Sequence, residues 1–340
     1  MLIDLVSDSI FYLVISFLVS AAISPIVISL LYKLHFTARH VVNKDKKNKE
    51  FIKIHGWKSG TPTMGGIIFF ITVPLLSWLI LPHTDTLKGF VVGLLIFGLV
   101  GIADDLFTMY AKRKNKLREI QNHFLFRVIK LTIMYAISLA FSYIFFVKIG
   151  TVGYTNADIL GFSVPVFYKY LIAGLVLPVV IYAFDIYDGA DGLSSGTLIV
   201  NTLGMASLLL LLGRYEFVPA LFMLTGGLIV FLYFNIPPAR VWMGAPGAMS
   251  IAFGLFYIAI VTKTIVPFFI ITLVQWIDFS SSVIQIFSLK FLKKKVFKIA
   301  PLHHLFEAIG WPEYKVVMRF WLTSLVTTII GVWVGLAILA

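Results

Sequence analysis

Long apolar stretches alternate with short polar segments along the whole chain. A helix needs about 20 apolar residues to cross a hydrocarbon core of roughly 30 Å, and several stretches reach that length with almost no charge. No Gly/Ser-rich linker divides the pattern, so we predict an all-α integral membrane protein with a single domain over residues 1–340. The ten expected spans lie near residues 10–31, 64–82, 88–104, 124–147, 169–184, 194–212, 216–234, 247–262, 264–288 and 317–339.

Composition agrees with a lipid-facing chain, because 59% of the residues are hydrophobic and only 13% are charged. The net charge of +12 does not indicate nucleic acid, since basic residues beside apolar spans report topology and contact with anionic lipid. The absence of cysteine excludes disulfides and thiolate metal sites. Asp4 and Asp8 stand where a cleavable signal would carry a basic segment, so we expect the first apolar run to be a span.

The charges of the loops predict the orientation of the chain. Lys and Arg gather in alternate loops, which the positive-inside rule places in the cytoplasm. Both termini should therefore lie outside the cytoplasm, with five loops inside. The basic residues are Arg39, Lys44, Lys46, Lys47, Lys49, Lys53 and Lys58 in the first such loop, Lys112, Arg113, Lys114, Lys116 and Arg118 in the second, and Lys290, Lys293, Lys294, Lys295 and Lys298 in the last.

Acidic residues gather at the cytoplasmic ends of the expected spans. Asp104 and Asp105 end one apolar run, and Asp185, Asp188 and Asp191 follow another at intervals of three residues. Positions three apart share a helix face, and the glycines between them allow a ligand to approach the backbone closely. The first pair could bind a hard cation such as Mg²⁺ or act as a base, and the second set could hold a metal–diphosphate and a nucleoside. The alternatives are a solvated helix end and an acidic turn.

Two other cytoplasmic segments carry weaker signals. Lys58, Thr61 and Thr63 lie in a Gly-rich stretch that could hold phosphate oxygens, although the ending of a Walker loop is absent and a turn with a helix cap is equally compatible. His303 and His304 are adjacent in the last inside loop. Neighbouring helical positions rarely point at one ion, so these histidines favour phosphate contact or acid–base chemistry over zinc binding.

Together the motifs resemble the polyprenyl-phosphate N-acetylhexosamine-1-phosphate transferases. The last motif, followed by VVMRFW, resembles the phospho-N-acetylmuramoyl-pentapeptide-transferase branch in particular, and the likeness runs from about residue 20 to the end. The motifs, in the family's order, are TPTMGG (61–66), Asp104-Asp105, DGADGL (188–193), FNIPPARVWMG (234–244) and APLHHLFEAIGWPE (300–313).

The resemblance implies a reaction and its participants. Undecaprenyl phosphate would attack the β-phosphorus of UDP-N-acetylmuramoyl-pentapeptide, with Mg²⁺ as cofactor, releasing UMP and leaving lipid I in a bacterial cytoplasmic membrane. The implied catalytic residues are Asp104, Asp105, Asp188, His303 and His304. The implied substrate-binding residues are Lys58, Thr61, Thr63, Gly189, Ala190, Asp191, Asn235 and Trp242. The implied metal ligands are Asp104, Asp105, Asp185 and Asp188.

The chain departs from the family pattern in several places. A third acid, usually a metal ligand, is Ala245 here, and Asp185 stands where the family usually has Asn. One hypothesis is that Asp185 restores the missing charge. The third histidine of the family is Leu305, Trp242 replaces a usual Phe, and the lysine expected beyond the first acid pair is lost near residues 122–123.

Other functions stay open at this point. A sister enzyme would use UDP-N-acetylglucosamine or another UDP-sugar, and loss of the acid at Ala245 could leave a weak or inactive homologue that binds nucleotide. A transporter is less compatible, because transporters place ionisable residues near the bilayer midplane on broken helices. The sequence also allows a homodimer.

Overall fold

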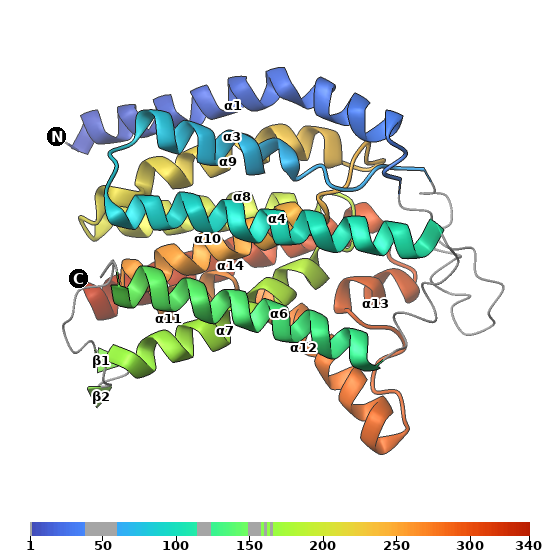
Figure 1. Ribbon diagram of the computed structural model, residues 1–340. Helices are drawn as coiled ribbons and strands as arrows, with labels where there is room; N and C mark the ends of the chain where they lie inside the picture. The colour runs from blue at the N-terminus through green and yellow to red at the C-terminus, as the bar shows by residue number, and fades with distance from the viewer. Residues whose placement is uncertain (1, 38–59, 114–123, 149–157, 160–161, 164–165) are drawn as a thin grey trace.

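The structure is a computed structural model that describes residues 2–37, 60–113, 124–148, 158–159, 162–163 and 166–340. Within these residues the chain forms a bundle of long helices, most of which lie roughly parallel or antiparallel to one axis (Figure 1). The helices are α1 (Leu2–Lys33), α3 (Ile67–Ile80), α4 (Asp85–Arg113), α6 (Phe124–Ser142), α7 (Val166–Tyr187), α8 (Leu193–Leu211), α9 (Val218–Asn235), α10 (Gly244–Val261), α11 (Ile265–Ile271), α12 (Leu273–Phe287), α13 (Leu302–Ala308) and α14 (Glu313–Leu339).

Shorter elements join or extend these helices. Antiparallel strands β1 (Asp158–Ile159) and β2 (Phe162–Ser163) form a small hairpin, which is a minor exception to the all-α prediction. The remaining elements are the π-helical turns η3 (Tyr143–Lys148) and η5 (Ser288–Leu292) and the 3₁₀ turn η4 (Tyr215–Phe217).

The membrane prediction is confirmed, since eight helices of the described chain are long and apolar enough to cross a bilayer. The other two expected spans have unusual forms. Helix α3 has 14 residues, so it rises about 21 Å and is shorter than the hydrocarbon core. The expected span 264–288 is broken, because α11 and the helix that follows it meet at an angle of 73°.

The break between α11 and α12 lies at Thr272. The Thr272 hydroxyl donates to the carbonyl oxygen of Phe268 at 2.7 Å and accepts from Trp276 Nε1 at 3.0 Å. Backbone and indole groups at the bend therefore find partners inside the protein, which an interruption at membrane depth requires. No Gly or Pro marks residue 272, so the sequence pattern did not indicate the bend.

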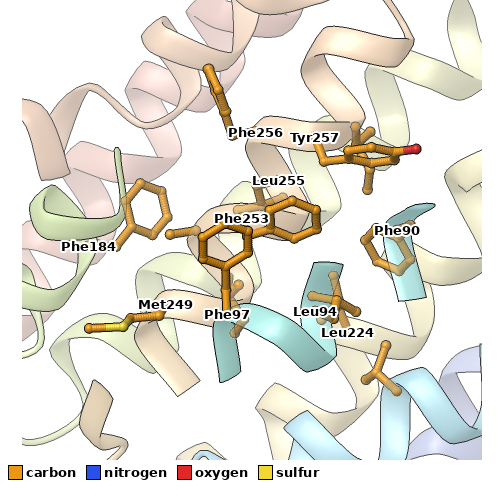
Figure 2. Close-up of a cluster of buried hydrophobic side chains, with 14 of the residues drawn as sticks. Phe90, Leu94, Phe97, Phe184, Leu224, Met249, Phe253, Leu255, Phe256 and Tyr257 are labelled. Atoms are coloured by element: carbon orange, nitrogen blue, oxygen red, sulfur yellow. The ribbon is translucent and has the colours of Figure 1, made fainter. Parts of the chain in front are cut away.

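Helix α10 forms the centre of the bundle, and 83% of its apolar window is buried, against 17% for α1 and 28% for α14. Phe253 of α10 stacks on Phe97 of α4 with ring centroids 4.9 Å apart, and Tyr257 stacks on Phe253 at 5.4 Å (Figure 2). The outer helices expose large apolar side chains, among them Leu322 and Trp333 of α14. Such a surface suits contact with lipid rather than water.

Both termini lie at the end of the bundle that also carries β1 and β2 (Figure 1). Helix α13 lies at the opposite end, where α4, α7 and α9 finish and α8, α10 and α14 begin (Figure 1). The turns between these helices bring distant sequence motifs together, so this end holds the candidate site.

Candidate active site

The turn between α7 and α8, residues 188–192, is held in place by side chains from other elements. Asn235, at the end of α9, accepts from the Gly192 amide at 3.0 Å and from the Ser195 hydroxyl at 2.9 Å. Its own amide nitrogen donates to the Val241 carbonyl oxygen at 3.0 Å. Because these polar atoms bind protein, the buried Asn235 side chain fixes the turn against the 236–243 segment.

Asp191 connects the same turn to the segment before α10 and to α14. Its carboxylate accepts from Trp242 Nε1 and from the Ala239 amide, each at 3.0 Å. Its backbone N–H donates to Glu313 Oε1 of α14 at 2.9 Å, and Trp321 Nε1 of α14 donates to the Gly192 carbonyl oxygen at 3.0 Å. Asp191, Asn235 and Trp242 therefore form one connected cluster, and their predicted contact with a nucleotide stays a prediction.

The TPTMGG segment pairs with the backbone that leads into α10. The Trp242 amide donates to the Pro62 carbonyl oxygen at 2.9 Å, and the Gly65 amide donates to the Trp242 carbonyl oxygen at 2.7 Å. Thr61 Oγ1 lies 3.5 Å from the Ala239 carbonyl oxygen. This pairing places Thr61 and Thr63 beside the 188–192 turn. Lys58, the remaining predicted residue of that stretch, lies outside the described residues.

The N-terminus of α10 donates to two of the predicted carboxylates. The Gly244 amide lies 3.3 Å from Asp188 Oδ2, and the Ala245 amide donates to Asp105, which Thr63 Oγ1 also approaches at 3.3 Å. The positive end of a helix favours nearby anions, so α10 stabilises both acids.

Gly244 makes this close approach possible. Its φ is +70°, and a Cβ atom there would lie 2.5 Å from Asp105 Oδ2 and 2.7 Å from Thr63 Oγ1. Only a glycine allows α10 to begin this close to α4 at a left-handed backbone angle.

Asp104 forms an ion pair that the sequence analysis missed. Lys130 Nζ of α6 lies 2.7 Å from one Asp104 oxygen and 2.8 Å from the other. The same ammonium lies 5.7 Å from the centroid of the Tyr182 ring. Lys130 therefore places a positive charge beside the first acid pair. The predicted loss of a family lysine near residues 122–123 lies outside the described part of the chain. A lone lysine within an apolar span was the signal that could have found it.

Asp185 belongs to the same acidic cluster, because it interacts electrostatically with Asp104, Asp105 and Lys130. Among these acids, Asp188, which follows the end of α7, has its pKa raised by this environment. Burial, followed by the negative charges of Asp185, Asp105 and Asp191, raises the pKa of Asp188 to about 8, although the hydrogen bond from the Gly244 amide acts in the opposite direction. The site thus concentrates negative charge that a bound cation would offset.

The donor set fits a hard divalent cation held together with substrate. Within the described residues, no three His, Asp or Glu side chains lie close enough to form a ready-made metal cage. Mg²⁺ usually binds one or two carboxylates, retains water, and takes further oxygens from substrate phosphates. The carboxylates of Asp105 and Asp188, both beside Gly244, supply the protein oxygens for such a site.

The two predicted histidines lie side by side on α13. Their ring centroids are 4.2 Å apart, and each Nδ1 contacts a carboxylate. His303 Nδ1 lies 2.9 Å from Asp278 Oδ2 of α12, and His304 Nδ1 lies 2.8 Å from Glu307 Oε2. Neither acid was predicted from the sequence. The signals were an acid inside an apolar span and a Glu three residues after a His on a short helix.

The glycine after Asp188 faces these histidines. A Cβ atom on Gly189 would overlap His303 Nε2 and would lie 3.3 Å from His304 Nε2. The turn between α7 and α8 and the histidines of α13 therefore meet at Gly189. Ala190, the next residue, packs in a small apolar cluster with Tyr187 and Leu193.

Comparison with known proteins identifies the class first. Residues 87–263 match the model of Glycosyl transferase family 4, and residues 58–70 match Phospho-N-acetylmuramoyl-pentapeptide-transferase signature 1.

Three relatives that match nearly the whole chain are each named phospho-N-acetylmuramoyl-pentapeptide-transferase. The protein of Acetivibrio thermocellus is 32% identical over 96% of this chain and 95% of its own length. The protein of Caldanaerobacter subterraneus subsp. tengcongensis is 32% identical over 96% and 98%, and that of Oceanobacillus iheyensis is 33% identical over 95% and 96%. The chain belongs to the phospho-N-acetylmuramoyl-pentapeptide-transferase family.

Proposed function

We propose that the chain transfers phospho-N-acetylmuramoyl-pentapeptide from its UDP carrier to undecaprenyl phosphate, so that UMP leaves and lipid I remains in the membrane. The observation that carries the proposal is the meeting of the family's motifs at one end of an apolar bundle. There the acids of α4 and of the 185–191 segment lie with the N-terminus of α10, and the histidines of α13 face Gly189.

The residues suggest how the two substrates are arranged. Two anionic groups must approach each other, and their repulsion is the main obstacle to the reaction. A carboxylate of the Asp104–Asp105 pair, about two turns before the end of α4, would take a proton from the lipid phosphate. Lys130 adds a positive charge on that side, and His303 and His304 face the opposite side, at Gly189.

We assign the divalent cation to Mg²⁺, held by Asp188 and Asp105 with Asp185 and Asp104 nearby. When bound, the cation would supply charge neutralisation on the diphosphate and the leaving UMP. Asn235, Asp191 and Trp242 shape the turn that would receive the uridine. This arrangement uses the chain's oxygens for the metal and its backbone turn for the nucleoside.

We place the site on the cytoplasmic side of a bacterial cytoplasmic membrane, with both termini on the other side. Two observations support this placement. The termini lie at the end of the bundle opposite α13 (Figure 1), and α1 and α4, which lead into Lys- and Arg-rich loops, both finish at the end where α13 lies. A water-soluble UDP donor would then meet a lipid phosphate at the inner leaflet.

A purified-protein assay tests the function. The protein is mixed with undecaprenyl phosphate, Mg²⁺ and UDP-N-acetylmuramoyl-pentapeptide, and both lipid I and UMP are followed. We expect both products in equal amounts and no UMP when UDP-N-acetylglucosamine replaces the donor. Turnover with UDP-N-acetylglucosamine alone would identify a sister transferase, and nucleotide binding without any UMP release would identify an inactive homologue.

A further inference from the structure

Asp278 makes two hydrogen bonds to one residue of the site. Its Oδ1 accepts from the His303 backbone amide at 3.0 Å, and its Oδ2 lies 2.9 Å from His303 Nδ1. The Asp278 side chain is completely buried, and His303 is 1% exposed. A buried carboxylate that binds both the backbone and the ring fixes where the imidazole lies and which nitrogen carries the proton.

The other nitrogen of His303 is directed at the predicted diphosphate position. His303 Nε2 is buried and has no hydrogen-bond partner within the described residues. It points at Gly189, where a side chain would overlap it. A buried polar atom without a partner is costly, so a native structure retains one where a ligand completes the bond.

Helix α12 also binds the loop that leads to α13. Gln285, two turns beyond Asp278, accepts from the amides of Val296 and Phe297 at 3.1 and 2.9 Å, and donates to the Phe297 carbonyl oxygen at 3.1 Å. The loop that leads to α13 is therefore attached to α12 before the histidines begin. The bend of 73° before α12 sets the direction of the helix that carries both Asp278 and Gln285.

We propose that Asp278 is a positioning residue that holds His303 Nε2 against the diphosphate of the donor at Gly189. This inference rests on the proposed function, because it takes the donor to be a nucleoside diphosphate. The carboxylate behind the ring stabilises positive charge on the imidazole when an anionic oxygen binds in front of it. With both ring nitrogens protonated, His303 donates from Nδ1 to Asp278 and from Nε2 to a phosphate oxygen, and Asp278 keeps Nε2 in place.

Nucleotide binding distinguishes this role from a structural one. UDP and UMP share the uridine and the first phosphate, so only UDP can reach His303 through its second phosphate. In Asp278→Asn we expect UDP affinity to fall about tenfold at constant Mg²⁺ while UMP affinity stays unchanged, and kcat to fall by about 10- to 100-fold. Asp278→Glu keeps the negative charge and should recover part of both losses. Isothermal titration calorimetry and UMP release provide the two measurements.

Two further variants complete the test. Asp85→Asn makes the same chemical change at the opposite end of the bundle, where Asp85 pairs with Lys88, and should leave both readouts unchanged. In a His303→Gln background, Asp278→Asn should have no additional effect, because Asp278 acts through His303. His303→Gln alone should lower the affinity for UDP but not for UMP, as Asp278→Asn does. The test therefore does not depend on the folding of a single variant.

Several results would overturn the proposal. One is an unchanged ratio of UDP to UMP affinity in Asp278→Asn and His303→Gln. Another is an equal loss of UMP affinity, and a third is a full additional effect of Asp278→Asn in the His303→Gln background. If the proposed function is wrong, the wild-type protein will release no UMP from any donor. The comparison of UDP and UMP binding still decides the role of Asp278 in that case.

Discussion

At the scale of single residues, the site depends on how a few charges are balanced. Asp104 is paired with Lys130 through two short contacts, whereas Asp105 and Asp188 accept hydrogen bonds from the amides at the start of α10. The Lys130 ammonium and the N-terminus of α10 thus stabilise three acids that lie close together. Removing either component leaves negative charge without compensation.

The first prediction concerns Lys130. In Lys130→Gln the ammonium beside Asp104 is lost, so the lipid phosphate meets uncompensated negative charge and kcat should fall by about 100-fold. Lys130→Arg keeps the charge and should retain a larger share of activity. Lys88→Gln removes a lysine paired with an acid at the opposite end and serves as the matched control. Equal activity of Lys130→Gln and wild type would show that this cation has no part in transfer.

The second prediction concerns Asp185 and Ala245. Both residues adjoin Asp105, since Asp185 interacts with it electrostatically and the Ala245 amide donates to it. If Asp185 supplies the acid that the family places at residue 245, Asp185→Asn should lower Mg²⁺-dependent turnover by about 100-fold. Adding Ala245→Asp to Asp185→Asn should restore part of the activity. Turnover that stays intact in Asp185→Asn contradicts the compensation.

At the scale of elements, the turn at 188–192 is stabilised by α9, α14 and the segment before α10 rather than by itself. Trp242 contributes through its indole N–H, which binds Asp191, and through its half-buried ring. The family usually has Phe at this position, which offers the ring without the donor. The two contributions of Trp242 can therefore be separated by substitution.

The third prediction follows from this separation. Trp242→Phe should keep turnover but lower the free energy of unfolding by about 1 to 2 kcal/mol, because a hydrogen bond to a buried carboxylate is lost. Trp242→Ala should also raise the KM for the donor, since the ring next to the turn is removed. Thermal unfolding in detergent and steady-state kinetics measure the two effects. A Trp242→Phe protein with wild-type stability would show that the indole hydrogen bond contributes nothing.

Some of these elements could be predicted from the sequence and others could not. Apolar length alone indicated most of the helices, since lipid requires long runs without charge. The bend at Thr272 was missed, because its polar groups are satisfied by an ordinary threonine side chain and not by a Gly or Pro. Lys130 and Asp278 were missed for a related reason: each is a single charge within an apolar run, and its partner lies on another helix.

At the scale of the whole molecule, polar contacts in the interior connect α8, α12 and α14. Asn201 of α8 accepts from Gln275 Nε2 of α12 at 2.6 Å, when its amide is oriented to satisfy its neighbours, and donates to Ser324 Oγ of α14 at 2.9 Å. All three side chains are fully buried. Within a membrane the hydrophobic effect does not drive helices together, so such bonds and close packing hold the bundle together.

The fourth prediction tests this interior network. Asn201→Ala should lower the free energy of unfolding by about 1 kcal/mol, which is the usual size of a polar contact between membrane helices. Ser207→Ala on the same helix removes an exposed hydroxyl that binds only the carbonyl oxygen of Leu203, and should have no measurable effect. Thermal unfolding of both variants in one detergent provides the comparison. Equal stabilities would show that the network does not join the helices.

The contacts of α14 with the 188–192 turn also have a consequence for biosynthesis. Glu313 and Trp321 are the last residues to emerge from the ribosome among those that hold this turn, yet they bind Asp191 and Gly192, made more than a hundred residues earlier. A nascent chain that has inserted every other helix therefore still lacks two of the hydrogen bonds that hold the 188–192 turn. We therefore expect transferase activity only after α14 has entered the membrane, so that a partly synthesised chain consumes no precursor.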